Sequence, residues 1–289
     1  MSEAPVIFDR ALVRRRQKRA LAQGAADFLL SAAVEELVAR LSAVQRDFSR
    51  ALDVGGPSPM LAEALAREGR EVVRIADDPA FAGAGAFILA EDESLPVPPA
   101  SFDLVVSALA LQWANDLPGV LAQARRALRP DGLLLACLVG GGSLSELRAS
   151  FTAAEAELEG GVSPRVAPFG DVRELGRLMQ RAGFALPVVD FETLTARYDS
   201  MFGLMADLRA MGATNALVSR ARKPLRRATL MRAAEIYAER FSDPDGRVRA
   251  SFDIVWLSGW APHESQQKPA ARGSGTVSLA EALKGARKP

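Results

Sequence analysis

Acidic residues follow three successive apolar runs in this chain, and their positions suit the binding of a nucleotide. Asp53 closes the first run, Asp77 closes the second, and Glu91 follows the third, with Asp92 as the alternative. Parallel strands of an α/β sheet bind ligands beyond their carboxyl ends, so acids at three neighbouring strand ends would face one ligand. Asp77 follows Asp53 at close to the roughly 20-residue spacing at which an acid meets a ribose. A carboxylate can accept hydrogen bonds from both ribose hydroxyls, and we therefore predict that these acids line a nucleotide site.

The turn after the first apolar run is expected to present backbone N–H groups to the same ligand. Residues 51–65 pass from an apolar run through Gly55 and Gly56 into a helical pattern, which is the strand–turn–helix order of nucleotide-binding domains. Pro59 suits the first turn of that helix, since a proline there loses no intrahelical bond. Pro57 suits the turn less well, because it fixes φ at about −65° and removes a possible donor. An ordinary βα turn with weakened or lost ligand binding is therefore the alternative interpretation.

Composition limits the class of protein. The chain has 289 residues, of which 49% are hydrophobic and 25% are charged, and this balance predicts a globular protein with a full core. A net charge of +1 gives no general attraction to nucleic acid, and no run of about 18 apolar residues is present to span a membrane. A single cysteine, Cys137, indicates a reducing compartment. The basic run 10–19 is similar to a targeting helix, but Glu3 and Asp9 argue against one, so we expect a cytoplasmic protein.

The hydrophobic patterns predict a single α/β domain over 1–289. Two helices are expected in 1–47, the nucleotide-binding core in 48–198, a helical insertion in 199–248, the last strand in 249–262 and a tail in 263–289. Seven strands are expected, namely the run that ends at Asp53 and the runs 71–76, 86–90, 102–109, 133–139, 188–198 and 250–260. A capping box of Ser143 with Glu146 is expected to open the helix after the fifth strand. Residues 200–240 are expected to be helical and basic, and 279–283 to form a short helix.

Two further segments are expected to border the ligand site. The first helix carries a basic cluster, which is either a solvated helix face or a lid in front of the nucleotide site (Arg14, Arg15, Arg16, Lys18 and Arg19). Loop 160–170 is expected near the entrance for the acceptor, because loops at the open carboxyl edge of such a sheet carry specificity.

The order of these units, with a late seventh strand, resembles the class I S-adenosylmethionine-dependent methyltransferase fold. That fold is a Rossmann-like, mostly parallel seven-stranded sheet with helices on both faces. The resemblance implies that S-adenosylmethionine is the cofactor, and that the acid after the third strand holds its adenine amino group. The residues implied to bind this cofactor are Asp53, Gly55, Gly56, Asp77, Glu91 or Asp92, and Leu109.

Four stretches narrow the resemblance to one family. They are 7–12 (Ile-Phe-Asp-Arg-Ala-Leu), 111–118 (Leu-Gln-Trp-Ala-Asn-Asp-Leu-Pro), 211–215 (Met-Gly-Ala-Thr-Asn), and 263–266 with 272–278. Together they resemble the assembly factor 5 family of respiratory complex I, in a bacterial member, over about residues 7–283. This resemblance implies an enzyme that modifies an arginine on a core subunit of complex I, a change reported for the family as hydroxylation. A more distant resemblance is to the malonyl-acyl-carrier-protein O-methyltransferase of biotin synthesis.

Three hypotheses of function follow. The first is a methyltransferase-like enzyme with a protein partner, a core subunit of complex I. The second is an acyl-carrier or small-molecule O-methyltransferase, and the third is a non-catalytic assembly chaperone with a degenerate cofactor pocket. No bound metal is expected, because the single histidine, His263, cannot complete the two-histidine, one-carboxylate site of iron oxygenases. The sequence identifies no catalytic residue and no oligomeric state.

Overall fold

The computed structural model describes residues 5–267, which form a seven-stranded sheet covered by helices. The strand order across the sheet is β3-β2-β1-β4-β5-β7-β6. The five strands from β1 to β5 are parallel, whereas β7 pairs antiparallel with β5 on one side and with β6 on the other. This is the predicted Rossmann-like, mostly parallel sheet. The strands are β1 (Arg50–Val54), β2 (Glu71–Ala76), β3 (Ala86–Leu89), β4 (Phe102–Ala108), β5 (Leu128–Val139), β6 (Ala185–Tyr198) and β7 (Val248–Trp260).

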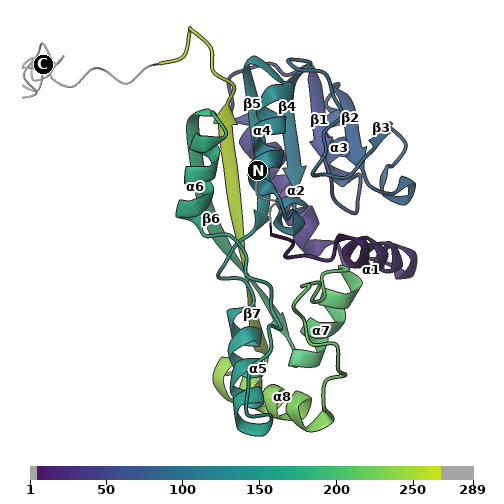
Figure 1. Ribbon diagram of the computed structural model, residues 1–289, viewed down its shortest axis with the longest axis vertical. Helices are drawn as coiled ribbons and strands as arrows, with labels where there is room; N and C mark the ends of the chain where they lie inside the picture. Colours follow the sequence, from purple (N-terminus) through teal and green to yellow (C-terminus); the bar gives the residue numbers. More distant parts are fainter. Residues whose placement is uncertain (1–4, 268–289) are drawn as a thin grey trace, which may run out of the picture.

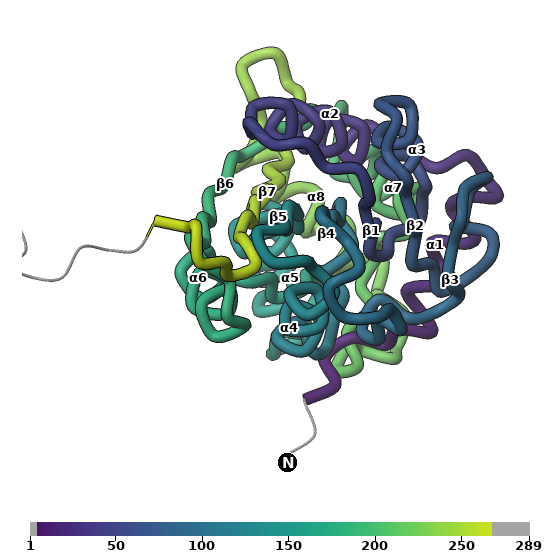
Figure 2. Tube along the Cα trace, turned by 90° about the horizontal axis from the view of Figure 1, so that it is seen from above, coloured from purple at the N-terminus to yellow at the C-terminus, as the bar shows by residue number. Residues whose placement is uncertain are grey.

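Helices cover both faces of the sheet, as Figures 1 and 2 show. The α-helices are α1 (Arg10–Gln23), α2 (Phe28–Ser42), α3 (Met60–Arg67), α4 (Leu117–Ala127), α5 (Ser145–Leu158), α6 (Val172–Arg181), α7 (Met201–Ala210) and α8 (Arg227–Phe241), with short 3₁₀ turns η1 (Pro79–Phe81) and η2 (Leu111–Trp113). The side chains of α4 and α6 join the core on one face. Those of α2, α3, α5, α7 and α8 join the core on the other.

The long strands β6 and β7 extend the sheet past the ends of the parallel strands (Figure 1). Their extension carries α5, α7 and α8 as a helical layer below the carboxyl ends of β1 to β5. Helix α1 lies between those strand ends and α7 (Figure 1). Gly212 at the end of α7 permits this packing, because a Cβ there would lie 2.7 Å from the Cα of Gln17. The carboxyl ends of the parallel strands are therefore covered by α1 and the helical layer.

Two boundary predictions were wrong. Strand β5 begins at Leu128 rather than at 133, because the turn-like residues 128–132 are built into the strand beside a register shift opposite Phe102 and Leu104. The stretch 200–240 is not continuously helical, since α7 ends at Ala210 and α8 begins only at Arg227.

The predicted capping box of Ser143 with Glu146 is also wrong. Leu144, in the left-handed region at φ 55°, is the residue before α5. The Ser143 hydroxyl accepts from the Asp253 N–H at 2.9 Å, and Glu146 accepts from the Ser251 N–H at 3.3 Å. Both side chains bind β7, so tertiary partners replace the local cap.

Two expectations lie outside the described residues, namely the motif at 272–278 and the helix at 279–283. Across 5–267, no helix combines the length and the apolarity that crossing a membrane requires.

Candidate functional site

The first predicted acid, Asp53, lies in a buried ion pair. Its side chain is 1% exposed and pairs with Arg74 of β2, whose side chain is 2% exposed. Arg74 also donates to the carbonyl oxygen of Gly56 at 2.6 Å and to that of Phe81 at 3.0 Å. Burial raises the pKa of Asp53, while the charge of Arg74 opposes the rise. Through its bond to the Gly56 carbonyl oxygen, the buried pair stabilises the turn after β1. That Asp53 binds a cofactor stays a prediction.

The glycine turn after β1 has the backbone shape that the sequence suggested. Gly55 and Gly56 both lie in the left-handed region, at φ 75° and 92°. A Cβ on Gly55 would lie 3.0 Å from the Cβ of Asp92, so only glycine allows this approach. The turn after β1 and the loop after β3 therefore meet at one point of the sheet edge.

Helix α1 places its basic side chains on the acids at the strand ends. Arg10 pairs with Asp92, and Lys18 pairs with Asp78 at 2.9 Å. Arg14 pairs with Asp77 at 3.0 Å and with Glu91 at 2.9 Å. These contacts fit the interpretation of the basic cluster as a lid over the strand ends better than its interpretation as a solvated helix face.

The electrostatics of these pairs differ with burial. Burial lowers the pKa of Arg14, but the charges of Asp77 and Glu91 raise it by more, so the net shift is upward. Burial raises the pKa of Asp92, and the neighbouring Arg10 opposes that rise. Of the two candidate acids after β3, Asp92 is buried against the glycine turn, whereas the side chain of Glu91 is 56% exposed.

Only a small cavity remains where these groups meet. Its volume is about 10 Å³, and its walls are Gly55, Gly56, Asp77, Asp92, Ala110 and Trp113 with Arg10 and Gln17 of α1. Such a space holds about one water molecule. The residue types fit a nucleoside, with glycines for close backbone approach and acids for hydroxyl and amino groups. The side chains of α1 take up the room, so they have to move before a nucleoside fits.

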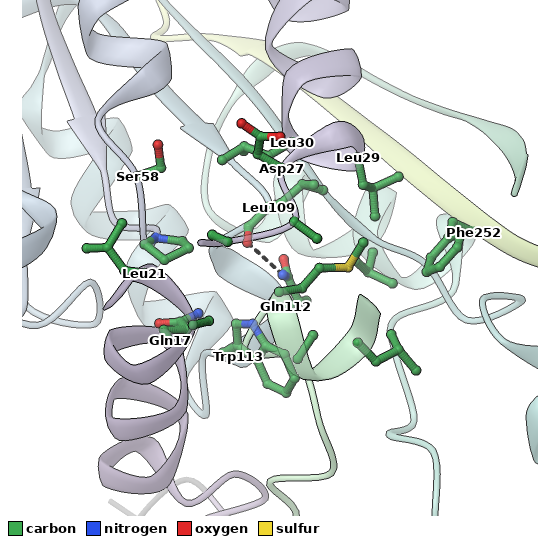
Figure 3. Close-up of a pocket in the computed structure, with 18 of the residues that line it drawn as sticks. Gln17, Leu21, Asp27, Leu29, Leu30, Ser58, Leu109, Gln112, Trp113 and Phe252 are labelled. Atoms are coloured by element: carbon green, nitrogen blue, oxygen red, sulfur yellow. Dashed lines mark hydrogen bonds between the residues drawn. The ribbon is translucent and has the colours of Figure 1, made fainter. Parts of the chain in front are cut away.

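A much larger cavity, of about 340 Å³, adjoins this point (Figure 3). Most of its lining is apolar, and it comes mainly from α1, α2, η2, α7, the ends of β4 and β5 and the loop before α6, including Leu29, Leu109, Trp113, Phe169 and Leu208. The polar lining residues are Gln17, Asp27, Ser58 and Gln112, and no lysine, arginine or histidine is among the lining residues. The cavity thus has the apolar walls and few polar groups of a small-molecule or side-chain site.

Leu109, a predicted cofactor residue, has a strained backbone at the wall of this cavity. Its φ is 48°, a value that leucine rarely adopts. Such a strained backbone persists only where surrounding interactions stabilise it, and it is frequent at functional sites. Its N–H donates to the carbonyl oxygen of Cys137 at 3.0 Å. Its own carbonyl oxygen accepts from the Gln112 side-chain nitrogen at 2.6 Å. These two hydrogen bonds fix the backbone after β4 and orient the side chain of Gln112, which lines the cavity.

A second cavity of about 210 Å³ shares part of this wall, including Trp113, Phe169 and Leu208. Loop 160–170 supplies Arg165, which donates to the buried Glu155 at 2.7 Å. Both this loop and α1 lie beside the cavities, and their place at the entrance for the acceptor stays a prediction.

The residues before α1 form one unit with η2 and the segment after α7. The Asn115 side-chain oxygen accepts from the N–H groups of Ile7 and Phe8, both at 2.8 Å. The Phe8 ring packs edge-on against Trp113, with centroids 5.3 Å apart. Phe8 also bridges Leu217 in an isolated antiparallel pair.

Helix α1 is anchored to the same segment at both its cap and its middle. Asp9 caps the helix by accepting from the Leu12 N–H at 3.0 Å, and it pairs with Arg220 at 3.1 Å. Arg16 donates to the carbonyl oxygens of Thr214 and Asn215, at 2.9 and 2.6 Å. Three of the stretches that narrowed the resemblance, 7–12, 111–118 and 211–215, therefore meet around α1.

The remaining described stretch lies elsewhere. His263 is exposed, and its Nδ1 lies 2.8 Å from the Ser265 hydroxyl. Gln266 donates to Asp131 at 2.9 Å, near the amino-terminal start of β5 and so at the opposite end of the parallel strands from the acids. Among residues 5–267, no group of three histidine, cysteine, aspartate or glutamate side chains is arranged to hold a metal ion.

Sequence reasoning missed Arg74, Arg10 and Gln112 as site residues. Arg74 carried a signal, because a charge inside the apolar run of β2 requires a buried partner. Gln112 and Arg10 stand in stretches that were recognised, but their local spacing does not show what they face.

Comparison with known proteins agrees with the fold. A family model described as a methyltransferase domain matches residues 25–187. Arginine-hydroxylase NDUFAF5, mitochondrial, of Danio rerio is 38% identical over 96% of this chain and 90% of its own length. The Homo sapiens protein of that name is 39% identical over 95% of this chain and 83% of its own length. A malonyl-acyl-carrier-protein O-methyltransferase of Laribacter hongkongensis is 40% identical, but over only 63% of this chain and 59% of its own length.

Solved structures support the fold alone. The YcgJ protein of Bacillus subtilis superposes with a TM-score of 0.53 at 15% identity, covering 79% of this chain and 99% of that one. The cyclase SpnF superposes with a TM-score of 0.52 at 15% identity, covering 91% of this chain and 99% of that one.

Proposed function

Because the chain belongs to the family of arginine-hydroxylase NDUFAF5, whose members match it over nearly its full length, we propose that it is an enzyme that modifies a protein arginine during assembly of respiratory complex I. It carries a methyltransferase domain, and S-adenosylmethionine is the cofactor that this domain is proposed to use. The observation that carries the proposal is a cavity of about 340 Å³, free of cationic lining residues, beside the carboxyl ends of the strands where such a domain binds its cofactor.

The residues proposed to hold the cofactor are those around the glycine turn. Gly55 and Gly56 permit close approach of the backbone, Asp77 is suited to accept from the ribose hydroxyls, and Asp92 is placed better than Glu91 to accept from the adenine amino group. Leu109 lines the large cavity, and its chain neighbours Ala108 and Ala110 lie against the glycine turn. When bound, S-adenosylmethionine supplies a methyl group that its sulfonium already activates. The chain's own part is then to position both partners and exclude water.

A macromolecular acceptor suits the surroundings of the cavities. The segment after α7 and the start of α8 carry exposed basic side chains, namely Arg222, Lys223, Arg226 and Arg227. A cluster of one sign steers and orients a protein partner of opposite charge. These side chains follow the 211–215 stretch that binds α1 by seven to twelve positions.

Two alternatives have a specific observation each. An acyl-carrier O-methyltransferase is favoured by the similarity over 63% of the chain, but its malonyl carboxylate would meet no cation in the lining of the large cavity. A non-catalytic assembly chaperone is favoured by the strand ends, where α1 leaves a cavity of about 10 Å³.

The test is to delete the gene and compare the membranes with those of wild-type cells. We expect reduced NADH dehydrogenase activity and one arginine of a core complex I subunit that lacks its modification by peptide mass. The mass difference also separates the addition of a methyl group from that of an oxygen atom. Normal activity with identical masses would contradict the proposal.

Complementation separates the alternatives. Cells that carry Asp77→Ala should stay deficient, whereas cells that carry Asp190→Ala, an acid of a surface ion pair on β6, should recover. Full recovery with Asp77→Ala would favour the chaperone. A requirement for biotin in the deletion strain would favour the O-methyltransferase.

A further inference from the structure

One residue that lines the large cavity, Gln112, carries a hydrogen-bond acceptor without a partner among the described residues. The side-chain oxygen of Gln112 is buried and, among the residues that the structure describes, has no hydrogen-bond partner. Its amide orientation is set, because the nitrogen donates to the Leu109 carbonyl at 2.6 Å (Figure 3). A flipped amide would bring two oxygens together. Buried acceptors are nearly always paired in native proteins, so this oxygen calls for a donor that arrives from outside.

The other residues that line the cavity indicate which kind of donor fits there. Its walls are apolar over most of their area, which suits an aliphatic stem. Trp113 and Phe169 line it with rings 6.4 Å apart and interplanar angle 80°, and aromatic faces attract a flat cation. Asp27 adds an exposed carboxylate on the wall, at the amino end of α2, where its side chain makes no capping bond. An apolar stem that ends in a planar, cationic donor is an arginine side chain.

We propose that Gln112 is the residue that selects the acceptor, by taking an N–H of the substrate guanidinium on its side-chain oxygen. Asp27 supplies the opposing charge at the wall. This inference rests on the proposed function and assigns the residues that recognise its arginine. Gln112 is a specificity-determining residue. Its orientation depends on the bond to the carbonyl oxygen of Leu109, whose backbone is strained.

Other acceptor groups match the cavity less well. A carboxylate would bring a second anion beside Asp27, with no cationic lining residue to pair with it. An ammonium group can donate to Gln112, but it lacks the planar face that packs on Trp113. The cavity should therefore rank a guanidinium above an ammonium and both above a neutral aliphatic chain.

The experiment is a calorimetric titration of the full chain with Nα-acetyl-arginine amide, and with the norleucine and citrulline analogues. Wild-type protein should bind the arginine probe more tightly than either analogue. Gln112→Met, which keeps the length and removes the acceptor, should weaken arginine binding by about tenfold to a hundredfold and leave norleucine binding unchanged. Gln23→Met, an exposed glutamine at the end of α1, is the matched control and should change nothing. Asp27→Asn should reduce the preference for arginine over the uncharged citrulline.

A second readout reports on the residue itself. The side-chain amide resonances of Gln112, assigned by their absence in Gln112→Met, should shift on addition of the arginine probe and not on addition of the norleucine probe. No binding of the arginine probe to wild type at millimolar concentration, or equal binding to Gln112→Met, would overturn the inference.

Failure of this inference differs from failure of the proposed function. If cells that carry Gln112→Met modify the arginine at wild-type rates, another residue selects the acceptor while the proposed function stands. If deletion of the gene leaves every arginine mass unchanged, the proposed function fails, whatever the probe titration shows.

Discussion

Replacing Arg14 by glutamine should strengthen the binding of a nucleoside cofactor. Arg14 pairs with Asp77 at 3.0 Å and with Glu91 at 2.9 Å, and its side chain is 32% exposed. Asp77 is the acid proposed to accept from the ribose, so a ligand has to displace the guanidinium. Each such partly exposed pair contributes up to about 1 kcal/mol. Arg14→Gln removes both pairs without removing Asp77, and with about 1 kcal/mol recovered in total it should raise cofactor affinity about fivefold.

The assay is a calorimetric titration with S-adenosylhomocysteine, which lacks the sulfonium charge and so leaves the ion pairs as the main electrostatic variable. Arg40→Gln is the matched control, because Arg40 of α2 also makes two ion pairs and its side chain is 31% exposed. Added salt should strengthen binding to wild type, since it screens the pairs that close the site, and should have less effect on Arg14→Gln. Unchanged or weaker binding by Arg14→Gln would refute the reasoning, because Arg14 would then be a ligand of the cofactor or α1 would not have to move.

Three other changes test the parts that hold the site. Arg74→Met should lower the free energy of unfolding by about 3–5 kcal/mol, because it leaves the carboxylate of Asp53 buried and unpaired, and adding Asp53→Asn should restore part of the loss in urea unfolding. Gly55→Ala should abolish cofactor binding by calorimetry, since it adds a crowded Cβ to a strained backbone, whereas Gly246→Ala, at φ 84° in open space, should only lose stability. The pKa of Asp9 is held below 3.8 by a helix N–H, so its contribution to stability is present above pH 3.8 and is lost as the pH falls through the lowered value. Asp9→Asn, which keeps an acceptor at the cap, should therefore unfold with a weaker pH dependence in acid.

Much of the fold could be predicted from the sequence, because buried parallel strands appear as continuous apolar runs. The run 71–76 matches β2, and Asp77 follows it as expected. The start of β5 could not be predicted from the same signals. Pro130 and Asp131 are typical turn residues, but pairing with β4 and a register shift make room for them inside a strand.

The capping box shows how tertiary contacts override local patterns. Ser143 and Glu146 have the spacing of a cap, and the sequence gives no sign that β7 lies beside them. Hydrogen bonds between residues about a hundred positions apart in the sequence compete with bonds between residues three positions apart. Only the folded chain shows which set is stronger.

The candidate site was predictable in its acids and not in what covers them. Local spacing indicated Asp77 and the pair of Glu91 and Asp92, because each follows a strand. It did not indicate that Arg10 and Arg14 would meet them, since those pairs join segments more than sixty residues apart. Burial against Gly55 distinguishes Asp92 from Glu91, and burial is a property of packing.

The most direct test of the central claim is a titration of S-adenosylmethionine into wild-type protein and Asp77→Ala. The claim is that the cofactor binds at the carboxyl ends of β1 to β3, beside the cavity that holds Gln112. We predict measurable binding to wild type and a loss of about tenfold to a hundredfold in Asp77→Ala, where the ribose hydroxyls lose their acceptor. No heat with wild type at millimolar ligand, or equal affinity for both proteins, would contradict the account.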